Sequence, residues 1–318
     1  MNVARSVLPL AMLAALVAGS AQAQVNVMLP AGTGGGWDTT GRQAFQALND
    51  AGIYTGGVNF TNTGGAGGTI GLAEFLSTSI GEPDALAVFG AITVGAIELN
   101  DSPIDLSEFR PVARLTAEYL VVAVAADSPY NSLGELVEAM KSDPGANAVG
   151  GGSAGGVDHI AFALLAQEAG IPVADLNYIP QTSGAETVTA IVNGTLTAGI
   201  SGTSEFIQFA DQGRIKLLGV TSAERRAGID DVPTFKESGY DIELANWRGV
   251  LAAPGAPDEN YATWVENFTA LAGSDAWKQV LATRGWDDYF LAGEAFGEFI
   301  AAETATQGQI LKDAGLVN

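Results

Sequence analysis

Three glycine-rich segments of the chain contain residue types that could bind an anion. Residues 29–41 read LPAGTGGGWDTTG, residues 62–71 read NTGGAGGTIG, and residues 150–159 read GGGSAGGVDH. Each segment follows a short apolar run and precedes a predicted helix. Glycines adopt backbone angles that other residues avoid, and the first amides of a helix, at the positive end of its dipole, attract a carboxylate or a phosphate. The three segments together predict an anion site made of backbone donors.

The third segment also matches two enzyme motifs. Gly150, Gly152 and Gly155 have the spacing of a dinucleotide-binding loop, and Ser153 stands in a G-x-S-x-G nucleophile elbow. The single histidine, His159, follows on the helix that the elbow would open, whereas a catalytic triad needs a histidine from a distant loop. A secreted serine esterase using Ser153 stays an alternative, but we expect no enzymatic activity and no catalytic residue.

Composition limits the partners and cofactors. The chain has 14 Lys plus Arg against 36 Asp plus Glu, a net charge of −22. Such a charge disfavours nucleic acid and anionic membrane surfaces as partners. It does not exclude an anionic small ligand, because exposed charges beyond about 8 Å are screened at physiological salt. With no cysteine and one histidine, we expect no metal site and no cofactor.

The first 23 residues have the pattern of a secretory signal peptide. Arg5 provides the positive start, residues 7–18 form an apolar core, and Ala21-Gln22-Ala23 is a small-x-small cleavage site. We expect cleavage near Ala23 and a mature chain that begins at Gln24. Export without cysteines indicates the bacterial periplasm rather than a eukaryotic extracellular space.

The mature chain alternates short apolar strands with helices, which predicts an α/β fold with mostly parallel sheets. One such set runs from Val25 to about Ala126, including separate strands at 111–115 and 120–125. A second set begins near Ala148. Residues 247–252 form the last predicted strand, and everything after them looks helical.

Because the C-terminal helices have no strands of their own to cover, they must return to the first set. The chain therefore crosses twice, near Ala126 and near Asn246, and forms two lobes with a cleft between them. We predict lobe 1 from residues 24–126 plus 246–318, and lobe 2 from residues 127–245.

Four other residues could contact a ligand. Arg110, Arg114 and Arg248 lie beside predicted strands, where an arginine can bind a carboxylate bidentately. Ion pairing with the abundant Asp and Glu is the favoured interpretation. Trp37 lies inside the first glycine segment and could form a wall of the site.

The sequence resembles the solute-binding receptors of tripartite tricarboxylate transporters, the Bug-type periplasmic receptors, and especially their tricarboxylate branch. The resemblance covers essentially the whole mature chain. Its motifs are Pro30-Ala-Gly-x-Gly-Gly-Gly-Trp-Asp38 with Arg42, Asn62-x-Gly-Gly-Ala-Gly-Gly-Thr-Ile-Gly71, Ala126-Asp-Ser-Pro-Tyr-x-Ser-Leu133, Gly151-Gly-Ser-Ala-Gly-Gly-x-Asp-His159, Ser201-Gly-Thr-Ser-Glu205, Val232-Pro-Thr-Phe-x-Glu237 and Asn246-Trp-Arg-Gly249.

The resemblance implies a two-lobed periplasmic binding protein of type II, the Venus-flytrap kind with two chain crossings. Such a receptor is a monomer that carries a small tri- or dicarboxylate, such as citrate, to a two-component membrane permease. An amino-acid or aromatic-acid receptor of the same fold is the alternative. The ligand would be held largely by loop amides and ordered water.

Carried over to this sequence, the resemblance places the ligand between two sets of residues. The lobe 1 set is Thr33, Gly34, Gly35, Gly36, Trp37, Asp38, Thr39, Gly64, Gly65, Gly67 and Gly68. The lobe 2 set is Ser153, Ala154, Gly155, Gly156, Thr182, Ser183, Thr203 and Ser204. The sequence Gln181-Thr182-Ser183 departs from the Tyr, Lys or glycine-rich turn of many relatives.

Overall fold

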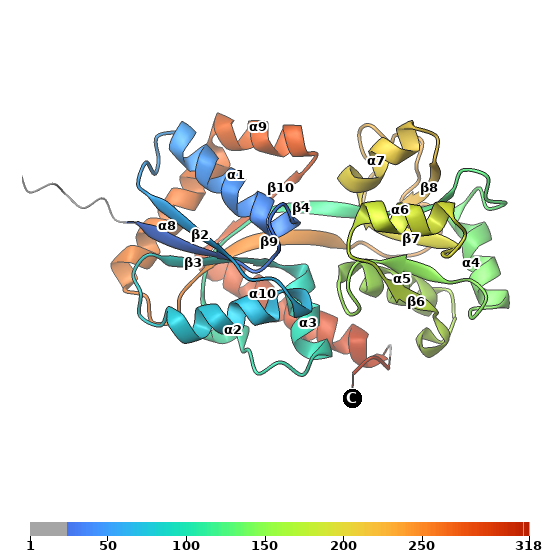
Figure 1. The fold of residues 1–318 in the computed structure, drawn as a ribbon, viewed down its shortest axis with the longest axis horizontal. Helices are drawn as coiled ribbons and strands as arrows, with labels where there is room; N and C mark the ends of the chain where they lie inside the picture. The colour runs from blue at the N-terminus through green and yellow to red at the C-terminus, as the bar shows by residue number, and fades with distance from the viewer. Residues whose placement is uncertain (1–23, 314, 318) are drawn as a thin grey trace, which may run out of the picture.

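The computed structural model describes residues 24–313 and 315–317, so the predicted signal peptide, Met1–Ala23, lies outside the described residues. Figure 1 shows two α/β lobes side by side, joined by the long strands β4 and β9. In pairing order the strands run β2-β1-β3-β9-β4-β7-β5-β6, and β10 and β8 both pair with β4. No helix within the described ranges is both long and apolar enough to span a bilayer.

Lobe 1 is a mixed sheet between two layers of helices. Its strands are β1 (Val25–Leu29), β2 (Val58–Asn62), β3 (Ala85–Gly90), β9 (Ala245–Ala252), the first part of β4 (Arg110–Ala125) and β10 (Asp287–Ala292). The first three pair in parallel, whereas β9, β4 and β10 pair antiparallel to their neighbours. One helix layer contains α1 (Gly36–Asp50), α8 (Asp258–Gly273) and α9 (Asp275–Arg284), and the other contains α2 (Thr69–Thr78), α3 (Ala91–Leu99) and α10 (Gly293–Asp313).

Lobe 2 repeats the plan with shorter strands. The strands β5 (Val149–Gly151), β6 (Tyr178–Pro180) and β7 (Ala198–Gly202) are parallel, and β7 and β8 (Ile215–Val220) flank the second part of β4. The helices are α4 (Leu133–Ser142), α5 (Val157–Glu168), α6 (Gly184–Val192) and α7 (Thr203–Asp211). Among residues 24–313 and 315–317 there are also three short 3-10 turns: η1 (Ala66–Gly68) and η2 (Leu106–Glu108) in lobe 1, and η3 (Val173–Asp175) in lobe 2.

Strand β4 is one continuous strand of 16 residues, where the sequence predicted two. It pairs with β9 through Tyr119 and with β7 from Leu120 onward. The chain therefore changes sheets in the middle of β4, and the predicted boundary at Ala126 lies just beyond its end. The division into 24–126 plus 246–318 and 127–245 stays a prediction.

Two elements differ from the sequence prediction. The expectation that everything after residue 252 is helical is wrong for β10, whose Tyr289 and Phe290 are good strand formers and which gains an edge of β4 as its partner. Helix α3 was not predicted, because it is an almost unbroken apolar run without helical periodicity. Only its burial between β9 and α10 identifies it.

The lobes also touch away from the crossing strands. A Cβ atom on Gly155, in lobe 2, would lie 2.4 Å from Cδ2 of Leu99 on α3, so a glycine at this position leaves room for the Leu99 side chain. On the opposite side, Arg226 of lobe 2 forms an ion pair with Asp287 of β10 at 2.6 Å. These contacts fix the orientation of the lobes in this structure.

Candidate functional site

The first and second glycine loops lie against each other in lobe 1. They follow the carboxyl ends of the parallel neighbours β1 and β2. A Cβ atom on Gly64 would lie 3.1 Å from the Gly32 nitrogen, and the Asn62 side chain donates to the Ala31 carbonyl at 3.0 Å. The backbone contact explains why the segment needs glycine at position 64.

Asp38 holds the first loop in place. Its buried carboxylate accepts hydrogen bonds from the Gly34 amide at 2.9 Å, from Arg42 at 2.8 Å and from Asn62 at 2.9 Å. Burial raises the pKa of Asp38, but these bonds outweigh it and leave the pKa below its usual value. Asp38 is thus ionised and positions the loop from within the protein.

Trp37 supports the loops from the core side. Its side chain is 8% exposed, and a Cβ atom on Gly68 would lie 2.7 Å from its ring. Gly65, Gly67 and Gly68 all have positive φ angles, which disfavour other residues. Trp37 therefore forms the base of the second loop.

The start of α1 provides the donors that the sequence predicted. Its N-cap is Gly35, and the Thr39 amide donates to the Gly35 carbonyl, while the Thr39 hydroxyl lies 3.4 Å from the Gly34 carbonyl oxygen. An α-helix offers no carbonyl partner to its first amides, here those of Gly36 and Trp37. Thr33, just before them, is exposed.

The third glycine loop, in lobe 2, is held by two side chains of α5. The Gly152 amide donates to Asp158 at 2.6 Å, and the Gly155 amide donates to Nδ1 of His159 at 3.0 Å. The Gly156 amide closes a turn on the Ser153 carbonyl at 2.9 Å. Ser153 and Ala154 stand exposed at the tip of this loop.

His159 is a neutral structural residue. Burial lowers the pKa of its imidazole to about 4, and its ring stacks on Tyr178 with centroids 4.1 Å apart. Because Nδ1 is occupied by the Gly155 amide, and because a base of such low pKa is weak, this geometry gives Ser153 no activating histidine. The esterase alternative therefore lacks support.

Helix α3 connects the second and third loops. Cγ2 of Ile92 lies 3.7 Å from the position of a Cβ atom on Gly67 and 3.6 Å from that on Gly156. Two of the loops thus contact one side chain, although they belong to different lobes. The three loops that the sequence singled out lie together.

Thr182 and Ser183 cap α6. The Ser183 hydroxyl, at the N-cap, accepts from the Glu186 amide at 3.2 Å, and the Glu186 carboxylate accepts from the Thr182 amide, one residue before the N-cap, at 2.8 Å. The Gln181 amide donates to the Gly151 carbonyl at 2.6 Å. This cap therefore lies beside the third loop.

Thr203 and Ser204 begin α7 and bind to β4. The Thr203 hydroxyl donates to the Tyr119 carbonyl at 2.8 Å. The Ser204 amide donates to the Glu118 carboxylate at 3.0 Å, and the Ser204 hydroxyl donates to the same oxygen. These residues are thereby tied to the point where β4 changes sheets.

A buried ion pair, Glu118 with Arg248, links the site segments of the two lobes. The two side chains are 3.2 Å apart and almost fully buried. The Arg248 guanidinium also lies 3.1 Å from the position of a Cβ atom on Gly36, and its Cζ lies 5.1 Å from the centroid of the Trp286 ring. A continuous path of contacts thus runs from Ser204 through the pair to the start of α1.

Glu118 is not among the predicted site residues, although the sequence carries a signal for it. A carboxylate inside the apolar run of residues 112–125 predicts a buried partner, and Arg248 inside another apolar strand is its match. The preference for ion pairing is confirmed for Arg248 and for Arg110, which pairs with Asp258 at 2.9 Å. It is wrong for Arg114, which donates to the Tyr289 carbonyl at 2.7 Å and stacks on its ring.

The charges of the site differ between the lobes. In lobe 2, burial raises the pKa of Asp158 to about 7 against the effect of its Gly152 hydrogen bond, and the carboxylates of Glu205 and Glu118 add to the rise. In lobe 1 the start of α1 carries the partial positive charge of a helix N-terminus, whereas Glu118 compensates the charge of Arg248. An anion is therefore favoured next to lobe 1. No group of three or more acidic or histidine side chains within the described ranges is arranged to hold a metal.

Sequence comparisons match most of the chain. The family described as "Tripartite tricarboxylate transporter family receptor" matches residues 42–316. A UPF0065 protein from Bordetella bronchiseptica is 29% identical over 269 residues, which are 81% of this chain and 77% of that protein. A UPF0065 protein from Cupriavidus necator is 24% identical over 195 residues, and the match spans only 58% of that relative's length.

Solved structures share the fold. A TctC solute-binding protein from Polaromonas is 26% identical, with a TM-score of 0.73 over 91% of this chain and 98% of that one. A protein of R. palustris solved with adipate is 22% identical, with a TM-score of 0.79 over 92% of this chain and 98% of that one. These likenesses confirm the predicted two-lobed α/β fold.

We expect Glu118→Gln to destabilise the protein by about 3 to 5 kcal/mol, because the buried Arg248 guanidinium would lose its counter-charge. Urea unfolding measures this change. The matched control is Glu237→Gln, which breaks an exposed pair with Arg225 and should cost far less, because solvent screens exposed pairs. Equal losses in the two variants would contradict a special role for the buried pair.

We expect His159 to make stability depend on pH. The pKa of its imidazole is about 4 in the folded protein and 6.5 ordinarily, so its contribution is full above pH 6.5 and is lost as pH falls toward 4. Relative to His159→Asn, the free energy of unfolding of the wild type should fall by roughly 3 kcal/mol over that window.

The comparison isolates the histidine, because Asp158, with its opposite pKa shift, is present in both proteins. Chemical unfolding at a series of pH values supplies the two curves. Parallel curves would show that His159 does not resist protonation in the folded protein.

Proposed function

The chain belongs to the tripartite tricarboxylate transporter receptor family, and from this premise we propose that it captures a small carboxylate between its lobes and delivers it to a two-component membrane permease. The family is one of solute-binding receptors, not enzymes. We further propose that the mature protein works in the periplasm as a monomer, after cleavage near Ala23. The Polaromonas relative is likewise a solute-binding protein.

The observation that carries the proposal is the meeting of helix N-termini from both lobes. The start of α1 adjoins the second glycine loop through Gly32 and Gly64, and Ile92 joins that loop to the third at the start of α5. Helix N-termini that converge from two sides favour a negatively charged guest. The high net negative charge of the chain does not oppose this, since its exposed charges are screened.

We propose two roles for the predicted site residues. Direct donors are the exposed backbone and hydroxyl groups of Thr33, Gly36, Ser153 and Ala154. Positioning residues are those whose polar groups already bind within the protein or that shape the loops: Gly34, Gly35, Trp37, Asp38, Thr39, Gly64, Gly65, Gly67, Gly68, Gly155, Gly156, Thr182, Ser183, Thr203 and Ser204.

The number of donors suffices for a receptor. A hydrogen bond to a charged group contributes about 1.5 to 3 kcal/mol, and a micromolar complex needs about 8 kcal/mol. Four or five such bonds reach that value after part of it is lost to ordering the lobes.

For the ligand we propose a di- or tricarboxylate such as citrate. The R. palustris protein was solved with adipate, a dicarboxylate. The second candidate is an amino acid, because Asp158 and its neighbouring carboxylate Glu205 in lobe 2 would favour the ammonium group of such a ligand.

A thermal-shift panel tests the proposal and separates the candidates. We expect a di- or tricarboxylate to raise the melting temperature in a concentration-dependent way, because a ligand that binds only the folded state stabilises it. The panel contains citrate, malate, adipate, several amino acids and aromatic acids, and calorimetry gives the affinity of each hit. Stabilisation by amino acids alone would select the second candidate, and no stabilisation by any acid would refute the carboxylate receptor.

The same hit tests the location of the site through Ser153→Asp. The new carboxylate at the loop tip should repel the ligand and weaken binding by about tenfold or more, whereas the N-terminus of α5 tolerates the charge. The matched control is Thr263→Asp, an exposed position in α8, which should leave affinity unchanged. Equal affinities in both variants would place the ligand elsewhere.

A further inference from the structure

Lobe 1 contains a cavity that the proposed carboxylate site does not use. It has a volume of about 630 Å³ and lies between the end of α3, the turn η2, the start of β4 and the middle of α10. That volume is within the range of small-molecule sites. None of the predicted site residues lines it.

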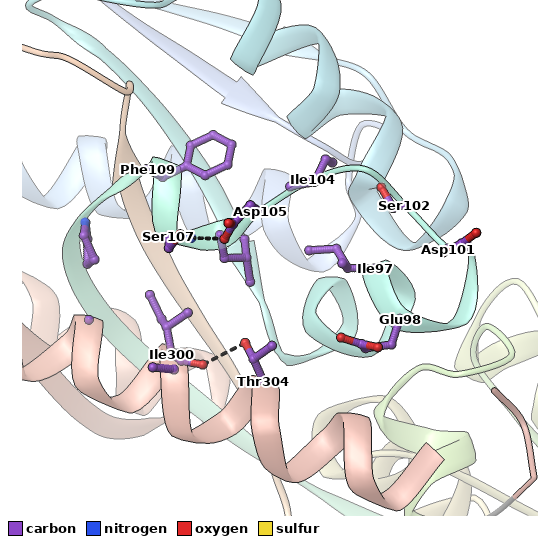
Figure 2. A pocket seen from close by; sticks show the side chains of 14 residues that line it. Ile97, Glu98, Asp101, Ser102, Ile104, Asp105, Ser107, Phe109, Ile300 and Thr304 are labelled. Atoms are coloured by element: carbon purple, nitrogen blue, oxygen red, sulfur yellow. Dashed lines mark hydrogen bonds between the residues drawn. The ribbon is translucent and has the colours of Figure 1, made fainter. Parts of the chain in front are cut away.

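The floor of the cavity is apolar. It is formed by Ile97 of α3, by Ile104, Leu106 and Phe109 of the segment before β4, and by Ile300 of α10, and each is at most 9% exposed. Figure 2 shows the side chains of Ile97, Ile104, Phe109 and Ile300 arranged around the hollow. A hydrocarbon group that binds there would move from water to an apolar surface, which the hydrophobic effect favours.

The polar groups at the opening are acidic or neutral. Glu98, Asp101 and Asp105 line the cavity together with the hydroxyls of Ser102, Ser107 and Thr304, and no basic side chain is among the residues that line it. In Figure 2 the Asp105 carboxylate lies over the hollow near Ser107, whereas Asp101 points away at the edge. Glu98 and Asp105 are thus the carboxylates placed to meet a bound group.

Asp105 keeps its negative charge. Its carboxylate accepts the Ser107 amide at 2.8 Å, and hydrogen bonds from Ser107 lower its pKa. The Asp105 side chain is exposed at the opening, where a ligand can reach its carboxylate. An apolar recess beside two carboxylates matches a molecule with a hydrocarbon body and one cationic end.

We propose that this cavity is a second binding site, which takes a small amphipathic organic ammonium ion. Its hydrocarbon body lies on Ile97, Phe109 and Ile300, and its ammonium group binds to Asp105 and Glu98. Because the site is a recess and not a flat face, it suits a small molecule better than the surface of another protein. The inference goes beyond the proposed function, since it needs no carboxylate and no permease.

Titration with n-hexylamine, followed by ligand-observed NMR at pH 7.5 and 150 mM salt, tests the site. We expect saturable binding that weakens about fourfold for each methylene removed, as in n-butylamine. Hexanoate and 1-hexanol should bind far more weakly, because the first is repelled and the second lacks the charge. The salt screens the general attraction of a cation to this acidic protein. No saturable binding, or equal binding of hexanoate, would overturn the proposal.

Variants locate the amine. Asp105→Asn keeps an acceptor for the Ser107 amide and should weaken hexylamine binding by about tenfold. Its matched control is Asp143→Asn in lobe 2, where an exposed aspartate likewise accepts a nearby amide, that of Ala146 at 3.0 Å. Ala301→Phe should block the cavity by filling it from α10. Equal effects of the two Asn variants, or unchanged binding in Ala301→Phe, would refute the assignment.

Discussion

The contact between the two crossing strands constrains the whole molecule. Glu118 on β4 and Arg248 on β9 are buried together, and each reaches a different lobe, since Glu118 binds the start of α7 through Ser204 and Arg248 packs on Gly36 at the start of α1. A buried charge requires its partner. The pair therefore couples the crossing strands β4 and β9 to the helix starts of both lobes, so that a shift of these strands also shifts the helix starts.

The glycine loops meet a steric requirement as well as an electrostatic one. Gly64 allows two loops of lobe 1 to touch, and Gly155, with its positive φ, allows the third loop to rest on Leu99 of α3. A Cβ atom at either place would collide with a neighbour or approach it too closely. Absent side chains thus do two things at once, because they bring the loops together and they expose peptide groups to a ligand.

Many of the polar groups in these loops already have partners inside the protein. Asp38, Asp158 and His159 each accept a loop amide, so the first and third loops are held in place before any ligand arrives. Rigid donors lose little entropy on binding, which favours affinity. The cost is that fewer amides remain for the ligand, and those that remain lie at the tips of the loops and in the first turns of the helices.

The sequence by itself determined the alternation of strands and helices, the two chain crossings, the glycine loops and the family. These features depend on local patterns, namely apolar periodicity, glycine clusters and motifs in a fixed order. Tertiary structure alone decided that β4 is one strand shared by two sheets, that residues 287–292 form a strand on its edge, and that Glu118 and Arg248, 130 residues apart, are partners. It also decided that Asp38 and Ser204 bind within the protein. The physical reason is that strand pairing and side-chain burial depend on neighbours from distant parts of the chain. A local sequence pattern does not specify which distant residues these neighbours are.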